Sequence, residues 1–258
     1  MMKSLRGRTI LVTGAAGGLG QAYARQLLAL GARLILTDID ENSLKRISEH
    51  LKEAPGQILG LIGADISNRE GCRHLYAQTK KTSPRLDMLI NNAGLINYGY
   101  FWEIPPAEWE KLMDVNLRAP MRLSQLFVPD MVSQGRGHIV FMCSVAGFAA
   151  TSLGTPYSAS KFGLRGFAMA LSGELKNKGV YVTIVYPSWV STKLLASPDF
   201  GSAEVKPLPR IFAENPEKVI RASITGIRKN KHHVCPGLLA KLVWQGAKIR
   251  PIVSQQSH

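Results

Sequence analysis

Short apolar runs alternate with helix-forming segments along almost the whole chain. Thr9–Thr13 is a β-branched apolar run that stops at Gly14, and residues 21–30 have the composition of a helix that Gly31 ends. Further runs with the character of strands are residues 33–37, 58–62, 86–90, 138–142, 180–185 and, shorter, 232–235. Such alternation implies right-handed crossovers, parallel strands and helices on both faces of one sheet. We therefore predict a doubly wound α/β protein with a parallel sheet of about seven strands.

Helical segments are expected between these strands, at residues 41–53, 68–81, 106–133 and 157–176, with another that opens at Asn215 and Pro216. Pro120 lies near the middle of the segment 106–133, where a helix should kink or break. The chain has 258 residues and no interdomain linker, repeat or low-complexity tract. A single domain with a sizeable core is expected.

Four residues that should end or follow predicted strands are Gly14, Asp38, Asn91 and Ser144. Because parallel strands end at the same edge of a sheet, these residues should lie close together. Ligands of open α/β sheets bind at that edge.

The stretch from Thr13 to Gly20 joins a predicted strand to a predicted helix and is rich in glycine. Glycines let the backbone approach a pyrophosphate, and the helix N-terminus offers unpaired N–H groups. Asp38, at the tip of the second strand, can accept hydrogen bonds from the adenosine ribose hydroxyls and would repel a 2′-phosphate, and Ile39 adds no positive charge. NAD is therefore expected in preference to NADP. The alternatives are a tight turn without a ligand and a helix N-cap at Asp38, although Asp40 can serve equally as the cap.

Tyr157 and Lys161 lie four residues apart in a predicted helix and so share one face, with Ser144 thirteen residues upstream of Tyr157. A neighbouring ammonium and a positive nicotinamide ring both favour the phenolate, which would make Tyr157 a general acid/base at working pH. Taken alone, a Tyr and a Lys at this spacing occur on many helices, so the other motifs decide the interpretation.

Together these residues resemble the short-chain dehydrogenase/reductase family in its single-domain form. The family's glycine turn is matched by Thr13, Gly14, Gly18 and Gly20, and its Asn-Asn-Ala-Gly motif by residues 91–94. Its tetrad is matched by Asn116, Ser144, Tyr157 and Lys161, over a resemblance that spans about residues 8–235. It implies a Rossmann-type fold and hydride transfer between a nicotinamide cofactor and an alcohol or ketone.

The resemblance also implies roles for single residues. Tyr157 would exchange the proton, Lys161 would hold the nicotinamide ribose and lower the pKa of Tyr157, and Ser144 would polarise the substrate carbonyl. Asn116 would lie at a helix kink and hold a water that links Lys161 to solvent; without the other three it would be a polar residue that breaks a helix. The expected cofactor contacts are Gly14, Ala16, Gly17, Gly18, Leu19, Gly20, Asp38, Ile39, Asp65, Ile66, Asn92, Ala93, Gly94, Tyr157, Lys161, Pro187, Val190 and Thr192.

One departure concerns the segment after the sixth strand, where the family usually has Pro-Gly. Here Pro187 is followed by Ser188, and Thr192 stands at the distance of the family's nicotinamide-contacting Thr. Because Ser has a Cβ and Gly has none, the backbone here is expected to take a path different from that of the family's glycine version.

The expected substrate contacts are Ser144, Ala146, Tyr157 and Trp189. The surrounding walls are largely apolar and comprise Leu95, Ile96, Tyr98, residues 145–149 and the loop 188–215 with Leu194, Leu195 and Phe200. They favour a lipophilic alcohol or ketone over a polyol, unless the loop's apolar residues merely pack it down. A loop of this length is more typical of a substrate lid.

Residues 1–236 are expected to form the catalytic domain and residues 237–258 a C-terminal extension. Leu238, Leu239, Leu242, Val243 and Ile249 would form one face of an amphipathic helix in it. Such a helix most often packs on its own protein or a sister subunit, and weak peripheral membrane contact through 237–253 is the alternative. The family also implies a homodimer or homotetramer.

The net charge is +14, and residues 176–258 contribute +9 of it, with 13 Lys or Arg and 4 Asp or Glu. A basic surface can face an anionic partner, yet no nucleic-acid motif accompanies it, and a merely solvated surface is the preferred explanation. Cys72, Cys143 and Cys235 are too dispersed for a disulfide framework, and no metal site is indicated.

The chain start lacks the apolar run of a signal peptide, so a cytoplasmic location is expected.

Two other functions fit the motifs less well. An NADP-dependent reductase of acyl thioesters would suit the basic surface, but Asp38 disfavours NADP. A non-catalytic dinucleotide-binding regulator would have no need of Ser144, Tyr157 and Lys161 together.

Overall fold

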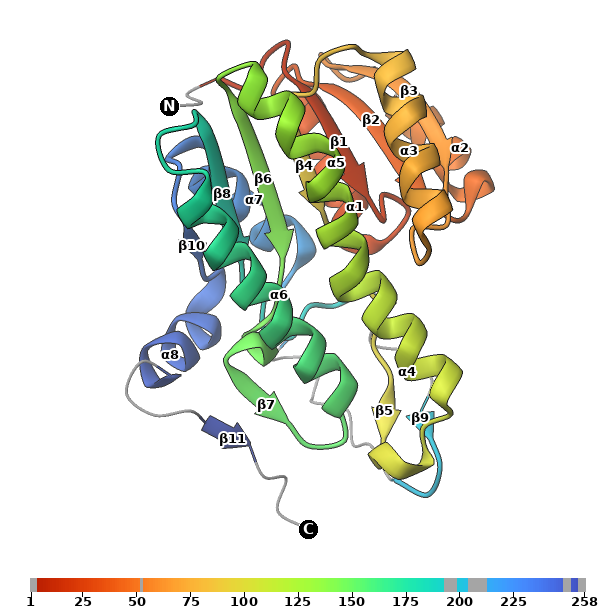
Figure 1. Cartoon of the computed structure of the whole chain (residues 1–258), viewed down its shortest axis with the longest axis vertical. Helices are drawn as coiled ribbons and strands as arrows, with labels where there is room; N and C mark the ends of the chain where they lie inside the picture. Colours follow the sequence, from red (N-terminus) through yellow and green to blue (C-terminus); the bar gives the residue numbers. More distant parts are fainter. Residues whose placement is uncertain (1–3, 52, 193–198, 204–212, 248–251, 255–258) are drawn as a thin grey trace.

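The computed structural model describes residues 4–51, 53–192, 199–203, 213–247 and 252–254. Its centre is a seven-stranded parallel sheet in the order β10-β8-β6-β4-β1-β2-β3 (Figure 1). The strands are β1 (Thr9–Thr13), β2 (Arg33–Asp38), β3 (Gln57–Gly63), β4 (Met88–Asn91), β6 (Gly137–Met142), β8 (Val180–Val185) and β10 (His233–Val234). This order is doubly wound, because the chain moves outward from β1 in one direction to β3 and in the other to β10. The predicted Rossmann-type fold in one domain is confirmed.

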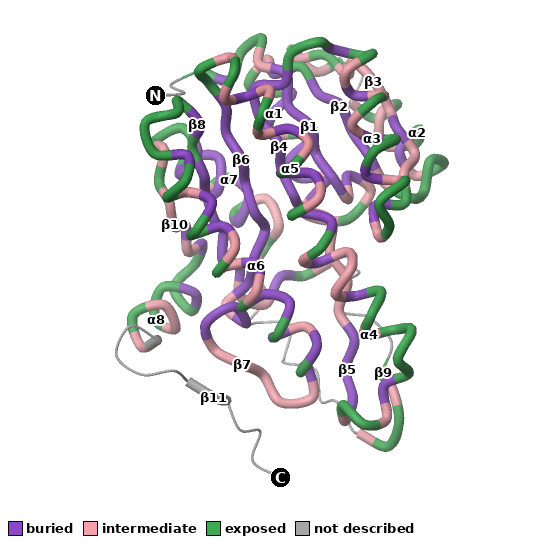
Figure 2. The backbone as a smooth tube through the Cα atoms, viewed as in Figure 1, coloured by how far each residue is buried: buried purple, intermediate pink, exposed green. Residues whose placement is uncertain are grey.

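Two hydrophobic cores cover the two faces of the sheet. One core contains side chains of α1 (Gly18–Ala29), α2 (Glu41–His50) and α7 (Pro216–Arg228), and the other those of α3 (Arg69–Thr82), α5 (Ala119–Ser133) and α6 (Thr155–Glu174). Along β1, Ile10 and Val12 enter the first core and Leu11 the second, as the alternation of side chains along a strand requires. The central strands are accordingly buried on both sides (Figure 2).

Short elements beyond the carboxyl ends of the strands complete the molecule. β5 (Tyr98–Gly99) pairs with β9 (Asp199–Phe200), and β7 (Ala149–Thr151) with β11 (Ile252–Ser254). The 3₁₀ turns η1 (Phe101–Glu103) and η3 (Val145–Gly147) and the helix α8 (Gly237–Ala247) lie in the same part of the fold (Figure 1). Pairing of β5 with β9 brings residues 199–200 of the loop 188–215 beside the segment that follows β4, which the sequence pattern did not predict.

The long helical region is interrupted, although not at Pro120. α4 (Pro106–Met113) and α5 are joined by η2 (Asp114–Arg118), a π-helical turn in which the Ala119 N–H donates to the Asp114 carbonyl, five residues back. Proline has no N–H to donate to the residue four before it, and its ring crowds that carbonyl. For Pro120 that residue is Asn116. The interruption of the helix, the π-helical turn η2, therefore lies one turn before Pro120 and surrounds Asn116.

His138 on β6 is a buried histidine held neutral by the fold. Its Nε2 lies 2.8 Å from the Thr183 hydroxyl, which donates its one hydrogen to the Lys231 carbonyl, 2.7 Å away. Nε2 must therefore carry the proton, and the Nδ1 atom has no partner in the described part of the chain. Burial lowers the pKa of His138 from 6.5 to about 4.

The unfolding free energy should therefore fall as the solution is acidified. Unfolded His138 binds a proton near pH 6.5 and folded His138 only near pH 4, so the stabilisation is complete above 6.5 and is lost as pH falls through this window. Between pH 7 and pH 5 the expected loss is about 2 kcal/mol. Urea unfolding at both pH values measures it, and the His138→Gln variant should lack this part of the pH dependence. Equal slopes in the two proteins would refute the assignment.

No helix in the described part of the chain combines the length and the apolarity that crossing a bilayer would require.

Candidate active site

The glycine turn connects β1 to α1 at the carboxyl edge of the sheet. Gly14 has a φ of +63°, and a Cβ there would lie 2.7 Å from the Ala93 Cα, so neither the conformation nor the space permits another residue. Helix α1 starts with Gly17 as its N-cap, without a side-chain cap and without an acidic residue in its first turn. The N–H groups of that turn are thus available to an anionic ligand.

The Asn-Asn-Ala-Gly segment is bonded directly to this turn. The Asn92 amide donates to the carbonyls of Thr13 (2.8 Å) and Gly14 (3.1 Å). The Thr13 hydroxyl accepts from the N–H groups of Asn92 (3.0 Å) and Ala93 (3.1 Å) and lies 3.3 Å from the Ile90 carbonyl. These bonds join the ends of β1 and β4, so that the turn and the segment form one rigid floor.

Two carboxylates lie at the ends of the next strands. Asp38 accepts from the N–H of Ala16 (2.9 Å) and is half-buried, and Ile39 beside it is 66% exposed. Asp65 follows β3 and accepts from the Ser67 N–H (2.9 Å); hydrogen bonding from Ser67 lowers its pKa. Asp38 thus faces the glycine turn, and no Lys or Arg among the described residues forms an ion pair with it.

Ser144, Tyr157 and Lys161 are brought together by β6 and α6. Ser144 follows β6, where its hydroxyl accepts from the Ala146 N–H (3.1 Å) and lies near enough to Tyr157 to lower the pKa of the phenol. Tyr157 and Lys161 lie one turn apart on α6, and the Lys161 Nζ is 5.5 Å from the centre of the Tyr157 ring. The ammonium donates to the Met142 carbonyl (3.0 Å), and Lys161 is only 4% exposed.

Burial dominates the protonation of both groups. It raises the pKa of Tyr157, while the hydrogen bond from Ser144 lowers it and the nearby Tyr98 raises it further. Burial likewise lowers the pKa of Lys161. In the chain alone the phenol is therefore held protonated, and the acidifying effect expected of Lys161 does not outweigh the cost of burying a phenolate.

Asn116 lies at the π-helical turn and is fully buried. Its side chain exchanges two hydrogen bonds with the backbone of Leu95, both 2.8 Å long, and donates to the Ser160 hydroxyl at 3.2 Å. A Cβ on Gly94 would meet the Asn116 Oδ1 at 3.3 Å and the Lys161 Nζ at 3.7 Å, so both groups lie beside the same face of Gly94. The structure thereby brings all four tetrad positions to one place.

Ser160 is a positioning residue that sequence reasoning missed. Its hydroxyl donates to the Tyr157 carbonyl (2.7 Å) and accepts from Asn116. A serine three residues after Tyr157 carries no distinctive signal, because its partner Asn116 is 44 residues away in the chain.

The segment after β8 runs past the glycine turn. Pro187 accepts from the Val145 N–H (3.0 Å), and the Thr192 methyl lies against Gly18, 2.8 Å from where a Cβ would stand. Val190 is buried and forms a bridge with Glu214. Ser188 has no positive φ and donates to the Glu214 carboxylate. A serine is thus accommodated without strain here, and its hydroxyl bonds the first residues of the loop 188–215 to the last.

The described substrate walls are mostly apolar. Leu95, Ile96 and Trp189 are half-buried and Ala146 is buried. Burial, with a smaller effect of Asp199, raises the pKa of Tyr98 to about 12. Leu194 and Leu195 lie outside the described residues. The remaining expected contacts, Leu19 in the first turn of α1 and Ile66 next to Asp65, flank the two binding segments.

Comparison with known proteins gives a consistent result. The family model for short chain dehydrogenases matches residues 8–199. Human epidermal retinol dehydrogenase 2 is 32% identical over 209 residues, which are 80% of this chain and 68% of that protein. A metagenomic short-chain oxidoreductase solved in complex with NADP is 31% identical, with a TM-score of 0.75 over 91% of this chain and 99% of that one. A short chain dehydrogenase/reductase from Burkholderia phymatum, solved with NAD, has the same fold over the full length of both chains, with a TM-score of 0.86 and 24% identity.

Proposed function

The chain belongs to the short-chain dehydrogenase/reductase family, and from this premise we propose that it transfers a hydride between NAD(H) and a lipophilic secondary alcohol or ketone. Family membership makes it an oxidoreductase that uses a nicotinamide cofactor. The observation that supports the reaction best is the position of the buried Lys161 amine, 5.5 Å from the centre of the Tyr157 ring, with Ser144 close enough to lower the pKa of Tyr157, at the sheet edge that carries the glycine turn.

The residues at this edge fit a nicotinamide dinucleotide. The uncapped N-terminus of α1 and the glycine turn would hold the pyrophosphate, Asp38 the adenosine ribose, and Asp65 and Ile66 the adenine. Residues 92–94, Pro187, Val190 and Thr192 would line the nicotinamide end. The Asn92 Oδ1 is buried without a partner among the described residues, as expected of a surface that a ligand completes. When bound, the cofactor supplies or accepts the hydride, and its oxidised ring adds a positive charge that favours the phenolate.

Each of the four tetrad side chains has a separate role in the proposed reaction. Ser144 donates to the substrate oxygen and fixes it beside the Tyr157 hydroxyl. Tyr157 gives a proton to that oxygen in ketone reduction and removes one in alcohol oxidation. Lys161 holds the nicotinamide ribose, and Asn116, which like the Lys161 amine lies beside Gly94, would hold a water that links Lys161 to solvent and so lets the proton leave Tyr157.

Preference for NAD(H) is supported by the charge at the end of β2. The Asp38 carboxylate is hydrogen-bonded to the glycine turn, so a 2′-phosphate placed there would be repelled by its negative charge. Among the described residues no Lys or Arg forms an ion pair with Asp38 that would offset this repulsion. A lipophilic substrate is supported by the apolar walls and by the name of the human relative, a dehydrogenase of retinol.

A panel of alcohols and ketones, assayed at the absorbance band of the reduced nicotinamide with each cofactor, tests the proposal. We expect a higher kcat/KM on long-chain or polycyclic secondary alcohols than on polyols, and a higher kcat/KM with NAD(H) than with NADP(H). A preference for polyols would overturn the substrate class.

The variant Asp38→Ser serves as the control for the cofactor. It keeps a hydrogen-bonding side chain but removes the charge, so the ratio of kcat/KM with NAD(H) to that with NADP(H) should fall by on the order of tenfold. An unchanged ratio would show that Asp38 does not select the cofactor.

We further propose a homodimer or homotetramer formed through α5 and α6. Met121 on α5 and Phe162 and Met169 on α6 are each about 40% exposed, which leaves apolar side chains on both helices available to a second subunit. Sedimentation of the purified chain measures the number of subunits.

A further inference from the structure

Helix α8 presents a row of leucines to solvent. Ala240, Val243 and Trp244 face the protein, and the Trp244 ring packs 5.4 Å from that of Phe148. On the outer side Leu238 is 73% exposed, Leu242 56% and Leu239 45%. The helix therefore exposes three leucines next to the polar Lys241 and Gln245, and the described part of the chain covers only its other side.

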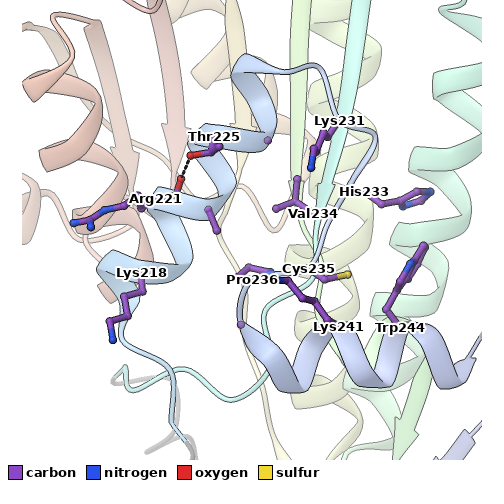
Figure 3. Close-up of a pocket in the computed structure, with 13 residues that line it drawn as sticks. Lys218, Arg221, Thr225, Lys231, His233, Val234, Cys235, Pro236, Lys241 and Trp244 are labelled. Carbon is purple, nitrogen blue, oxygen red and sulfur yellow. Dashed lines mark hydrogen bonds between the residues drawn. The ribbon is translucent and has the colours of Figure 1, made fainter.

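A basic groove runs beside these leucines, between α7 and α8. It has a volume of about 520 Å³, and Figure 3 shows Lys218 on the α7 side and Lys241 on the α8 side. Arg221 and Lys231 complete a set of four cations, and none of the lining residues is acidic. Arg221 acts electrostatically on Glu217, but Lys218, Lys231 and Lys241 form no ion pair within the described chain. Part of the positive charge of residues 176–258 is thus concentrated at one place, next to exposed leucines.

We propose that α8 and this groove bind the surface of an anionic membrane. Helices that lie in a bilayer interface place apolar side chains among the acyl chains and cations among the headgroups. Here the apolar side chains are those of Leu238, Leu239 and Leu242, and the cations are those of Lys218 and Lys241. A helix such as α8 is far too short to span a bilayer, so the contact is peripheral.

A second copy of the chain is a poorer occupant of this surface. In a twofold contact the same patch faces itself, which would oppose the cations of one groove to those of the other. Anionic headgroups instead complement them. The membrane contact would also lie near the substrate, because α8 packs against the 3₁₀ turn η3, which begins directly after Ser144.

Vesicle flotation with the full-length protein tests the proposal. Vesicles of phosphatidylcholine alone and of phosphatidylcholine with phosphatidylserine serve as probes, and the protein should float with the second kind and much less with the first. The double variant Leu238→Ser/Leu242→Ser should lower partitioning onto the anionic vesicles by at least about tenfold. Lys218→Glu/Lys241→Glu should lower it similarly and abolish the preference for the anionic lipid.

Matched controls come from other surfaces. Leu30→Ser replaces an exposed leucine at the end of α1, and Lys81→Glu/Lys178→Glu reverses two exposed lysines. Both controls should float like the unmodified protein. Circular dichroism and activity on a water-soluble alcohol check that the α8 variants fold, which also separates a failure of this proposal from a failure of the proposed function.

Two results would overturn the proposal. One is that the unmodified protein floats with neither kind of vesicle, or equally with both. The other is that Leu238→Ser/Leu242→Ser reduces the number of subunits in sedimentation while flotation stays unchanged, which would assign α8 to a subunit contact.

Discussion

Replacing Tyr157 by Phe is expected to lower kcat/KM for alcohol oxidation by about 10²- to 10⁴-fold, the contribution typical of a positioned acid/base. The change removes one oxygen and leaves the ring, so packing on α6 and the position of Lys161, 5.5 Å from the ring centre, should persist. Steady-state rates with the best substrate of the panel measure the effect. Fluorescence titration with the reduced cofactor should show binding within a few-fold of the unmodified protein, which would locate the loss in the proton transfer.

The matched control is Tyr181→Phe, because Tyr181 is 42% exposed and lies at the amino end of β8, whereas the site lies at the carboxyl ends of the strands. It should retain full activity. If Tyr157→Phe also keeps activity within about tenfold, the phenol is not the acid/base and the assignment of the site is wrong.

The pH profile adds a check that a merely structural effect would not reproduce. Alcohol oxidation requires the phenolate, so its rate rises with pH through the pKa of Tyr157, whereas ketone reduction requires the phenol and declines over the same range. The hydrogen bond from Ser144 lowers that pKa. In Ser144→Ala the pKa should therefore rise and the rising limb of the oxidation profile should move to higher pH. A lower rate with an unmoved limb would mean that Ser144 acts on the substrate alone.

The framework of this site was predictable because local sequence determines it. Alternating apolar runs specified the seven strands to within about two residues. Parallel strands then placed the residues that follow them, among them Gly14, Asp38 and Ser144, at one edge of the sheet. The spacing of Tyr157 and Lys161 likewise needed only the geometry of a helix turn.

The features that sequence did not predict depend on contacts between distant parts of the chain. Ser188 bonds Glu214 across 26 residues, and Ser160 bonds Asn116 across 44. Short strands such as β5 and β9 have too few residues for a periodic pattern and form only because they pair. The protonation of Tyr157 depended on how deeply α6 is buried, and burial reversed the effect that its spacing from Lys161 suggested. These contacts, strand pairings and burial depths follow from the packing of distant segments, and a short stretch of sequence carries no information about that packing.

A single methyl group at Gly20 is expected to destabilise the protein and to abolish cofactor binding. In the variant Gly20→Ala the new Cβ would overlap the Gly14 carbonyl oxygen and lie 2.7 Å from the Ala15 Cα. Both are backbone atoms, which cannot turn aside as a flexible side chain would. Relief requires α1 to move away from the turn, and Asn92 resists this because it holds the carbonyls of Thr13 and Gly14. The expected cost is about 3 kcal/mol or more, or about 10 °C in melting temperature.

Alanine substitutions at two other glycines show whether the loss of stability in Gly20→Ala comes from crowding of the new Cβ or from the loss of a glycine as such. Gly166 is exposed on α6 with no atom of its own chain within 4 Å of a new Cβ, so in a single subunit Gly166→Ala should leave the unfolding free energy unchanged or raise it by up to about 1 kcal/mol. At Gly17 the Cβ would meet only the Gly14 oxygen, at 3.4 Å, an ordinary contact. Gly17→Ala should therefore keep the melting temperature, so that any loss of NADH binding in it reports the closeness of the turn to the phosphates. If Gly20→Ala melts like Gly166→Ala, α1 can move away from the turn at little cost, and the turn is not the rigid cradle that pyrophosphate binding requires.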